Sequence, residues 1–230
     1  MKIAAILTGK KNSSLKNKNL LKIKGRPIFS YPAYTAKKIK KIDRFFVSSD
    51  SNYILNYCYK LGYEKIKRPK SLCKENSLHV DVIKHALIFM REKKFFPDIV
   101  LILLANAPII KTKWLNDCLN ILKNDKKITS VVPVIKNNDF NPLRAKKIKK
   151  NYLTNYTKSK KIVSSNRQSL ENSYFLCHNF WVIKTKFFYK NDGEPPWNFM
   201  GKRVKPYVVD KSIDIHTQDD YELAKILLKK

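Results

Sequence analysis

Cysteine is scarce in this chain, and its spacing excludes two kinds of cross-link that stabilise a fold. Cys58, Cys73, Cys118 and Cys177 lie far apart among 230 residues and form no C-x-x-C pair. This spacing matches neither a structural zinc site nor a disulfide framework. Cys58 and Cys118 fall on the apolar sides of predicted helices, where we expect buried free thiols.

Acidic residues are also few. The sequence has 18 Asp and Glu against 48 Lys and Arg, so its formal net charge is +30. A charge of this size raises the hypothesis of nucleic-acid binding. The lysines are spread along the whole chain, however, together with many Asn, Ile, Tyr and Phe, as in proteins encoded by AT-rich genomes. We therefore expect no nucleic-acid partner, although the charge favours anionic substrates.

Long apolar runs and a leader segment are missing as well. The strongest apolar run covers residues 99–105, which is far shorter than a membrane span. Met1 and Lys2 lead directly into strand-like residues, without the regions of a signal peptide. We expect a globular, cytoplasmic protein with no membrane partner.

What the sequence does contain is a regular alternation of strand and helix patterns. Predicted strands cover residues 3–7, 45–49, 65–67, 98–105, 128–135, 175–183 and 204–209. Predicted helices lie within residues 28–40, 54–61, 80–90, 112–122 and 218–229. This order predicts a mostly parallel, three-layer α/β sheet, whose ligands bind beyond the carboxyl ends of its strands. Functional residues are therefore expected in the loops 8–19, 48–50, 68–79, 105–112 and 214–217.

Residues 136–172 differ from the rest of the chain. They are dense in Lys, Asn and Ser and show little periodicity. We interpret them as an inserted arm, or a flexible excursion, of a single domain that spans residues 1–230. A contact between subunits is one role that such an arm can have.

Residues 212–224 place charged side chains beside the start of a helix. Asp214 lies in a run, residues 212–215, that is predicted to be extended, and His216 follows two residues later. Thr217 is a typical N-cap residue, with Asp220 as its reciprocal partner in a capping box. Hard cations and phosphate groups bind favourably where a strand ends and a helix starts.

The first loop, residues 8–19, follows a strand with Gly9, hydroxyl side chains and several lysines. It contains neither the G-x-x-x-x-G-K-[ST] pattern nor G-x-G-x-x-G. Its backbone N–H groups can hold a triphosphate, and a lysine can neutralise charge during its transfer. A solvated basic turn explains the same composition, so the loop alone does not decide between them.

Several segments in order along the chain carry a resemblance to a known family. They are residues 6–11, 18–20, 25–28, 46–50, 68–77 and 214–224. They resemble the opening loop, the second strand, the Arg-Pro-x-x-Leu segment and the closing Asp-Ile-Asp-Thr motif of the acylneuraminate cytidylyltransferases, or CMP-sialic acid synthetases. The chain is thus similar to a divergent member of that family over most of its length outside residues 136–172.

The resemblance implies a Rossmann-like nucleotidyltransferase fold and a reaction that needs Mg²⁺. In that reaction, the anomeric hydroxyl of a nonulosonic acid attacks the α-phosphate of CTP and expels pyrophosphate. The implied catalytic residues are Lys18 and Asp214, with Asp214 and His216 at the metal. The implied nucleotide-binding residues are Thr8, Gly9, Lys10, Asn19, Arg68 and Ser77. The implied acceptor-binding residues are Asn106, His178 and Asn179. Family members are commonly dimers joined near residues 136–172, so a homodimer is expected.

Three departures from the family pattern concern the site. Gly9 stands where the family has an arginine, and Lys10 replaces it only as a point charge. His216 replaces the second aspartate of Asp-x-Asp, although Mg²⁺ prefers oxygen ligands. The segment 103–108 lacks the family's glutamine. These departures leave the identity of the sugar open.

Other polar and aromatic residues have structural interpretations. Asp50 is expected to cap the following helix, and His79 and His85 are expected to be solvated helix positions. Trp181 is expected in the core or at its rim. Residues 194–201 form a rigid aromatic loop that either covers an acceptor pocket or seals the end of the sheet.

Two other functions stay as alternatives. One is a nucleotidyltransferase with another sugar or a phosphonate as its acceptor. The other is a non-catalytic, basic RNA-binding protein, which binds RNA with a steep salt dependence and is indifferent to CTP. Stabilisation by each of the four nucleoside triphosphates distinguishes a cytidylyltransferase from both.

Overall fold

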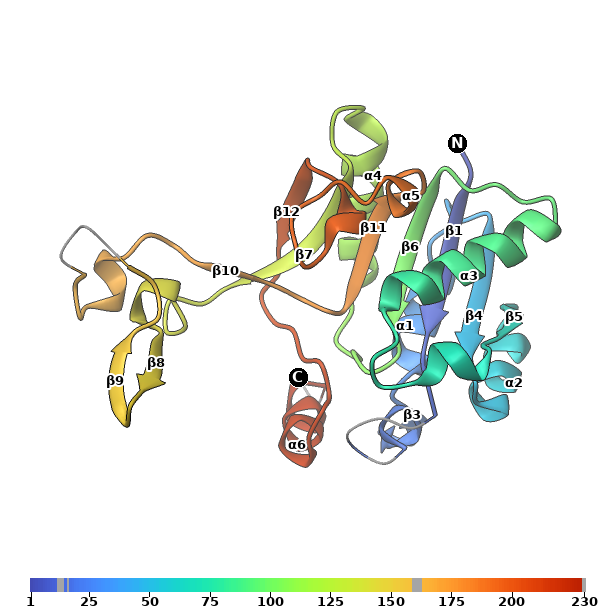
Figure 1. Ribbon diagram of the computed structural model, residues 1–230. Helices are drawn as coiled ribbons and strands as arrows, with labels where there is room; N and C mark the ends of the chain where they lie inside the picture. Colours follow the sequence, from blue (N-terminus) through green and yellow to red (C-terminus); the bar gives the residue numbers. More distant parts are fainter. Residues whose placement is uncertain (12–14, 16, 159–162, 229–230) are drawn as a thin grey trace.

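The computed structural model describes residues 1–11, 15, 17–158 and 163–228. Within them, an eight-stranded sheet runs through the centre of the chain, with helices on both faces (Figure 1). Seven of its strands are hydrogen-bonded, each to the next, in the order Tyr174–Leu176 (β10), Ser130–Lys136 (β7), Phe180–Lys184 (β11), Ile99–Leu104 (β6), Ile3–Thr8 (β1), Arg44–Ser49 (β4) and Glu64–Lys67 (β5). The eighth, Val204–Val208 (β12), pairs with β7.

Strand direction brings many loops to one edge of the sheet. β1, β4, β5 and β6 are parallel, so their carboxyl ends lie together. β11 runs antiparallel between β6 and β7, and its first residues therefore lie at the same edge. β7 and β12 are parallel to each other and also end there. The α/β fold with a mainly parallel sheet, predicted from the alternation of patterns, is confirmed.

Alternate strand residues separate two apolar cores. Ala5 and Leu7 of β1 belong to the larger core, whereas Ala4 and Ile6 belong to the smaller one. The larger core contains Ser30–Lys37 (α1), Asn52–Lys60 (α2) and Thr112–Asn124 (α4). The smaller core contains His79–Glu92 (α3), on the near face in Figure 1, and Phe187–Lys190 (α5). Because both faces are covered, the central strands are continuous apolar runs.

The strand predicted over residues 175–183 is in fact two strands. β10 and β11 both pair antiparallel with β7 on the side opposite β12, because Val134 pairs with Leu176 of β10 and also with Val208 of β12. The ladder is interrupted at Cys177, His178 and Asn179, where the register with β7 shifts. Trp181, in β11, is buried in the smaller core.

Residues 212–215, predicted to be extended, lie in a loop and do not form a strand of the sheet. β12 ends at Val208, and the loop is held to the sheet by the Ile215 N–H, which donates to Asn106 O at 3.1 Å. Helix α6, Gln218–Leu227, then begins with the predicted capping box of Thr217 and Asp220. Residue 229, the predicted end of this helix, lies outside the described residues.

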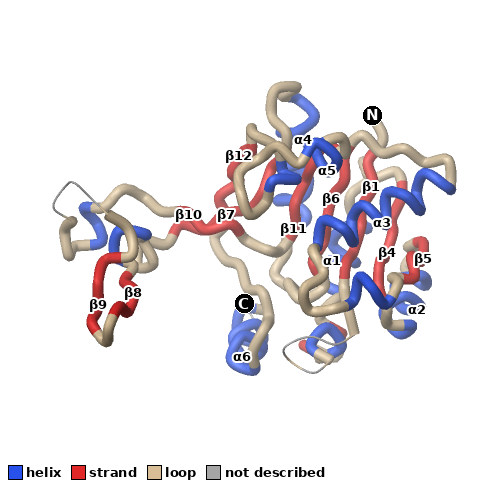
Figure 2. Tube along the Cα trace, in the orientation of Figure 1, coloured by secondary structure: helices blue, strands red, loops and turns tan. Residues whose placement is uncertain are grey.

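Residues 136–172 leave the sheet after β7 and return through β10 (Figure 2). Their described part contains an antiparallel hairpin of Lys146–Lys149 (β8) and Tyr152–Asn155 (β9). Asn141 fixes the base of this arm, because its Nδ2 donates to Glu171 O at 3.0 Å and to Ser173 Oγ at 2.9 Å. The arm therefore has regular structure that its composition did not indicate.

Two smaller features complete the fold. Lys22–Ile23 (β2) and Arg26–Pro27 (β3) form a short hairpin after the first loop. Cys58, Cys118 and Cys177 are buried free thiols, as the first two were predicted to be. No helix within the described part of the chain combines the length and apolar character that crossing a membrane requires.

Thr217→Ala is expected to lower the free energy of unfolding by about 1 kcal/mol, because it removes the side-chain cap of α6. Urea unfolding measures this loss. Thr112→Ala is the matched control. Thr112 is the first residue of α4, whose N-cap, Lys111, makes no side-chain cap bond. Since alanine has the higher helix propensity, the control is not expected to lose stability. Equal losses in both variants would contradict the capping box.

Candidate functional site

The end of β1 forms one wall of a pocket. Thr8 is buried, and its Oγ1 lies 2.9 Å from Nε2 of His79. Gly9 packs closely on the chain that follows β6, since a Cβ at this position would lie 2.7 Å from Ala105 Cβ. The Gly9 N–H also donates to Ser48 O at 3.2 Å. A side chain at residue 9 would push the first loop away from the sheet.

Lys18 and Asn19 enter the same pocket from a short 3-10 turn, Lys18–Leu20. Only 6% of Lys18 and 4% of Asn19 is exposed. Asn19 Nδ2 donates to Lys10 O at 2.9 Å and so fixes the backbone of the loop. Asn19 Oδ1 is buried without a hydrogen-bond partner in the described structure. A ligand that donates to this oxygen would recover the cost of its burial.

Arg68 lies directly after β5 and is buried. Its guanidinium donates to Ser48 O at 2.9 Å and to Ser48 Oγ at 3.4 Å. Burial lowers the pKa of Arg68 from its usual value. Ser77 Oγ donates to Ser71 O at 3.0 Å and closes the loop that leads to α3. Arg68 therefore brings a fixed cation to the pocket, and Ser77 lies beside it.

His79 is a pocket residue that the sequence did not predict. Its ring, expected to be solvated at the start of α3, lies between Thr8 and Trp181, with 5.5 Å between the two ring centroids. Burial lowers the pKa of His79 to about 4, and the charges of Arg68 and His178 act in the same direction. His79 is therefore neutral at pH 7.

His85 also differs from the prediction of a solvated position. It lies on α3, and its Nδ1 is buried without a hydrogen-bond partner among the residues that the structure describes. It does not line the pocket.

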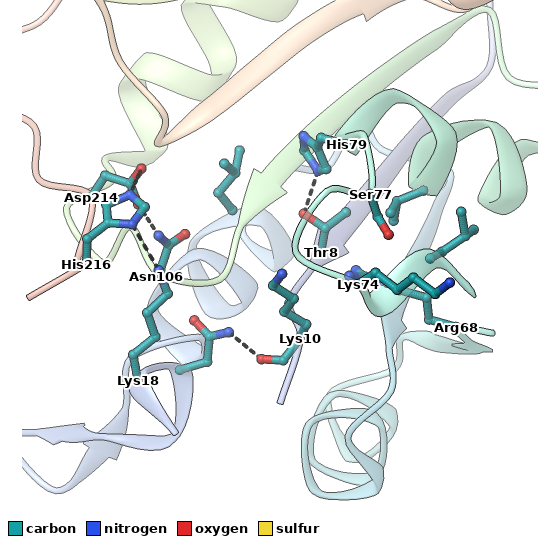
Figure 3. Close-up of a pocket in the computed structure, with 15 residues that line it drawn as sticks. Thr8, Lys10, Lys18, Arg68, Lys74, Ser77, His79, Asn106, Asp214 and His216 are labelled. Atoms are coloured by element: carbon teal, nitrogen blue, oxygen red, sulfur yellow. Dashed lines mark hydrogen bonds and ion pairs between the residues drawn. The ribbon is translucent and has the colours of Figure 1, made fainter. Parts of the chain in front are cut away.

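Asp214 and His216 reach the pocket on the loop before α6. Asp214 Oδ2 lies 2.9 Å from His216 Nε2, and Asp214 Oδ1 accepts a hydrogen bond from Asn106 Nδ2. On its other side, His216 has Lys18 Nζ 3.4 Å from its Nδ1. The Asp214 side chain is 22% exposed. Loops that follow β1, β6 and β12 are thus joined by one series of polar contacts (Figure 3).

All of these groups line one pocket of about 310 Å³. In Figure 3, Lys18, Asn106, Asp214 and His216 lie across the pocket from Arg68, Lys74, Ser77 and His79. The described lining has four cationic side chains, Lys10, Lys18, Arg68 and Lys74, and a single carboxylate, Asp214. Burial lowers the pKa of Lys18, which Asp214 opposes and Lys10 reinforces. The excess of positive charge favours a polyanionic ligand.

His178 and Asn179, predicted to bind an acceptor, do not line this pocket. Asn179 is fully buried, and its amide is bonded to Ile109 O and Ser212 Oγ. It ties two loops together and has no surface left for a substrate. The His178 ring lies between Trp181 and Trp197, with centroids at 5.5 Å and 5.9 Å. Burial lowers the pKa of His178, and the charge of Asp214 opposes this.

Asp50 and the loop of residues 194–201 have defined structural roles. Ser51, and not Asp50 as predicted, is the N-cap of α2. Asp50 Oδ1 instead accepts from the Lys11 N–H at 2.7 Å and anchors the first loop. In residues 194–201, Phe199 is buried in the smaller core, and Trp197 packs on the His178 ring. Phe199 therefore ties this loop to the core.

The donor set of the pocket fits Mg²⁺ through one protein carboxylate. No group of three or more His, Cys, Asp or Glu side chains that could hold a metal ion occurs among the described residues. Mg²⁺ commonly binds through one or two carboxylates and completes its shell with water and substrate phosphates. Asp214 is the residue that would hold it here.

Comparison with known proteins decides the family. The sequence profile described as cytidylyltransferase matches residues 6–227, which is nearly the whole chain. The chain belongs to this family. This cytidylyltransferase is 27% identical to the post-translational flagellin modification protein B of Campylobacter coli, over 95% of this chain and 91% of that protein. It is 25% identical to the CMP-N,N'-diacetyllegionaminic acid synthase of Campylobacter jejuni, over 94% of this chain and 90% of that protein.

A solved structure shows the same fold for the cytidylyltransferase. A CMP:2-keto-3-deoxy-manno-octonic acid synthetase complexed with CTP matches with a TM-score of 0.72 at 15% identity, and the match covers 100% of this chain and 99% of that one. The resemblance found in the sequence, the enzyme class and the nucleotidyltransferase fold are thus confirmed.

The pocket contains all the predicted site residues except His178 and Asn179, and it adds Lys74 and His79. Lys74 could not be recognised as a pocket residue, because it is one lysine among many in the sequence. His79 was missed because helical spacing does not show which polar position at the start of α3 faces a neighbouring strand.

The His79→Gln variant is expected to lose less stability than the wild type when the pH is lowered. The free histidine ring titrates near 6.5 and the folded ring at about 4, so the unfolded chain binds the proton first. The contribution of the neutral His79 ring to the free energy of unfolding is therefore fully present above about pH 6.5. This contribution falls by on the order of 2 kcal/mol as the pH approaches 4. Urea unfolding of both proteins at about pH 7 and about pH 4.5 measures this. An equal decline in the two proteins would show that the ring is not buried.

Proposed function

We propose that this cytidylyltransferase transfers CMP from CTP to the anomeric hydroxyl of a nonulosonic acid and releases pyrophosphate. The observation that carries the proposal is the meeting of Lys18 and Asp214, which both contact His216 in one cationic pocket. A relative that is similar over nearly its whole length is named as a synthase of a CMP-linked nonulosonic acid.

The two sides of the pocket suggest how CTP lies in it. We place the triphosphate beside Lys10, Lys18 and Asp214, where the loop after β1 lines the pocket. The cytidine then extends towards Arg68 and the neighbouring Ser77 and His79. A neutral His79 and the hydroxyl groups of this side suit the uncharged polar edge of a base.

The chemistry is a displacement at phosphorus. The acceptor oxygen forms a bond to the α-phosphorus while the bond to the bridging oxygen breaks, and pyrophosphate leaves with that electron pair. The hydroxyl proton passes from the acceptor oxygen to solvent water. Lys18, buried and held at a fixed position, stabilises the negative charge that develops on the phosphate oxygens. Asp214 would hold Mg²⁺, which would supply further positive charge to the reaction.

We place the acidic sugar next to Asp214, on the side of His178. Ser212 Oγ donates to Asn179 Oδ1, so the loop that carries Asp214 lies against the chain next to His178. Trp197 packs on the His178 ring and gives this side an aromatic wall. The net positive charge of the pocket attracts the carboxylate of such a sugar.

We also propose that the arm joins two copies of the chain. Ile148 and Leu153 are opposite each other in the β8–β9 hairpin and are 77% and 74% exposed. Phe140, at the base of the arm, is 71% exposed. A two-stranded hairpin away from the sheet is marginally stable alone, so a second copy is the partner that covers this apolar surface.

Pyrophosphate release from CTP, Mg²⁺ and a panel of nonulosonic acids tests the activity. We expect release with at least one of these sugars, and a larger rise in Tm with CTP than with ATP, GTP or UTP. Release only with a non-acidic acceptor would replace the proposed sugar class. Indifference to CTP in both assays would refute the nucleotide assignment.

Lys18→Ala and Asp214→Asn are each expected to lower kcat by about 10²- to 10³-fold, because each removes a group that acts on the phosphates. Lys22→Ala and Asp219→Asn are matched controls, since both residues are exposed and neither lines the pocket. Circular dichroism checks that all four variants fold. Rates near wild type in both site variants would contradict the site.

Replacing Ile148 and Leu153 together by lysine is expected to convert a dimer to a monomer in analytical ultracentrifugation. The reason is that like charges then face each other on the surface that the partner covers. Ile88→Lys, at a 52% exposed position on α3, is the control and is expected to leave the sedimentation coefficient unchanged. A wild-type protein that is monomeric at micromolar concentration would refute the proposed contact.

A further inference from the structure

Three side chains form a row of hydrogen bonds along one side of the pocket. Lys18 Nζ lies 3.4 Å from His216 Nδ1, and His216 Nε2 lies 2.9 Å from Asp214 Oδ2. Asn106 Nδ2 donates to the other oxygen of Asp214. The row therefore runs from an ammonium, through an imidazole, to a carboxylate, and Figure 3 shows its members side by side.

Lys18 and Asp214, at the two ends of this row, determine which ring nitrogen of His216 carries the hydrogen. An ammonium group only donates hydrogen bonds, and an ionised carboxylate only accepts them. Nδ1 of His216 therefore accepts from Lys18, and Nε2 carries the hydrogen that is donated to Asp214. We propose that His216, in this tautomer, is a positioning residue that bridges Lys18 and Asp214 and is not a metal ligand. The roles of Lys18 and Asp214 towards CTP and Mg²⁺ rest on the function proposed above.

The lone pairs of the ring support this assignment. A metal ion needs a ring nitrogen with a free lone pair, and Nε2 uses its hydrogen towards Asp214. The lone pair of Nδ1 points to the ammonium of Lys18, whose positive charge repels a divalent cation from that nitrogen. Asp214 is then the single protein ligand of the cation.

The backbone holds the ring in place without a metal ion. The His216 N–H donates to Asp220 Oδ2 at 2.9 Å, and the same carboxylate oxygen accepts from the Thr217 N–H at 2.8 Å. The start of α6 thus places the imidazole between its two partners. A carboxylate at position 216 would instead add a negative charge and would lack the N–H that orients Asp214.

Long-range ¹H–¹⁵N correlation spectra of ¹⁵N-histidine-labelled protein, without nucleotide or metal, test the tautomer directly. The His216 signals are assigned as those lost in His216→Ala. We expect a neutral ring with hydrogen on Nε2. Hydrogen on Nδ1, or on both nitrogens, at about pH 8 would overturn the bridge. This result does not depend on activity, so it separates the present proposal from the proposed function.

Electron spin echo spectroscopy of the Mn²⁺–CTP complex of the same labelled protein tests the coordination. We expect no directly bound histidine nitrogen. A nitrogen coupling that disappears in His216→Ala would overturn the proposal. Failure of Mn²⁺–CTP to bind at all would count against the proposed function, and the tautomer measurement would still decide the bridge.

The kinetics of two variants distinguish a positioning role of His216 from a purely structural one. His216→Ala is expected to lower kcat by about 10- to 100-fold, because it releases Lys18 and Asp214 together. His216→Gln is expected to recover part of this loss, since its amide carries both a donor and an acceptor. Gln218→Ala, at an exposed position of the same helix start, is the matched control. Equal kcat in the alanine and glutamine variants would refute the bridging role.

Discussion

The parallel pairing of β1, β4, β5 and β6 is the constraint on which the pocket depends. It places the loops that follow these strands at one edge of the sheet, where Thr8, Arg68 and Asn106 meet. The parallel pairing of β12 with β7 then directs the chain back to the same edge before α6. Residues 198 positions apart, Lys18 and His216, come into contact for this reason.

The residues that could be predicted are those whose position follows from strand ends alone. Thr8, Gly9 and Asp214 lie where a strand, or the loop after it, reaches the carboxyl edge, and the alternation of patterns locates that edge. Asn179 was assigned to the acceptor through the family resemblance, but neighbouring loops bury it, and the sequence does not report such burial. His79 is the opposite case, since its place depends on the turn before α3.

The formal charge of +30 has two parts with different consequences. Most lysines, such as Lys22 and Lys24, are exposed and remain hydrated, so salt screens them. Lys18 and Arg68 are buried beside the pocket and are screened far less. Within the pocket, this second, small group keeps most of its electrostatic effect, so total charge is a poor guide to the ligand.

The interruption between β10 and β11 has a mechanical consequence. β10 is the returning root of the arm, and after residues 177–179 the chain becomes β11, which pairs with β6 and β7. The link between the two strands is short, so tension on the arm is passed along the backbone to the aromatic cluster around His178 and Trp181. A load on the arm thus reaches this cluster before it reaches the parallel strands whose loops line the pocket.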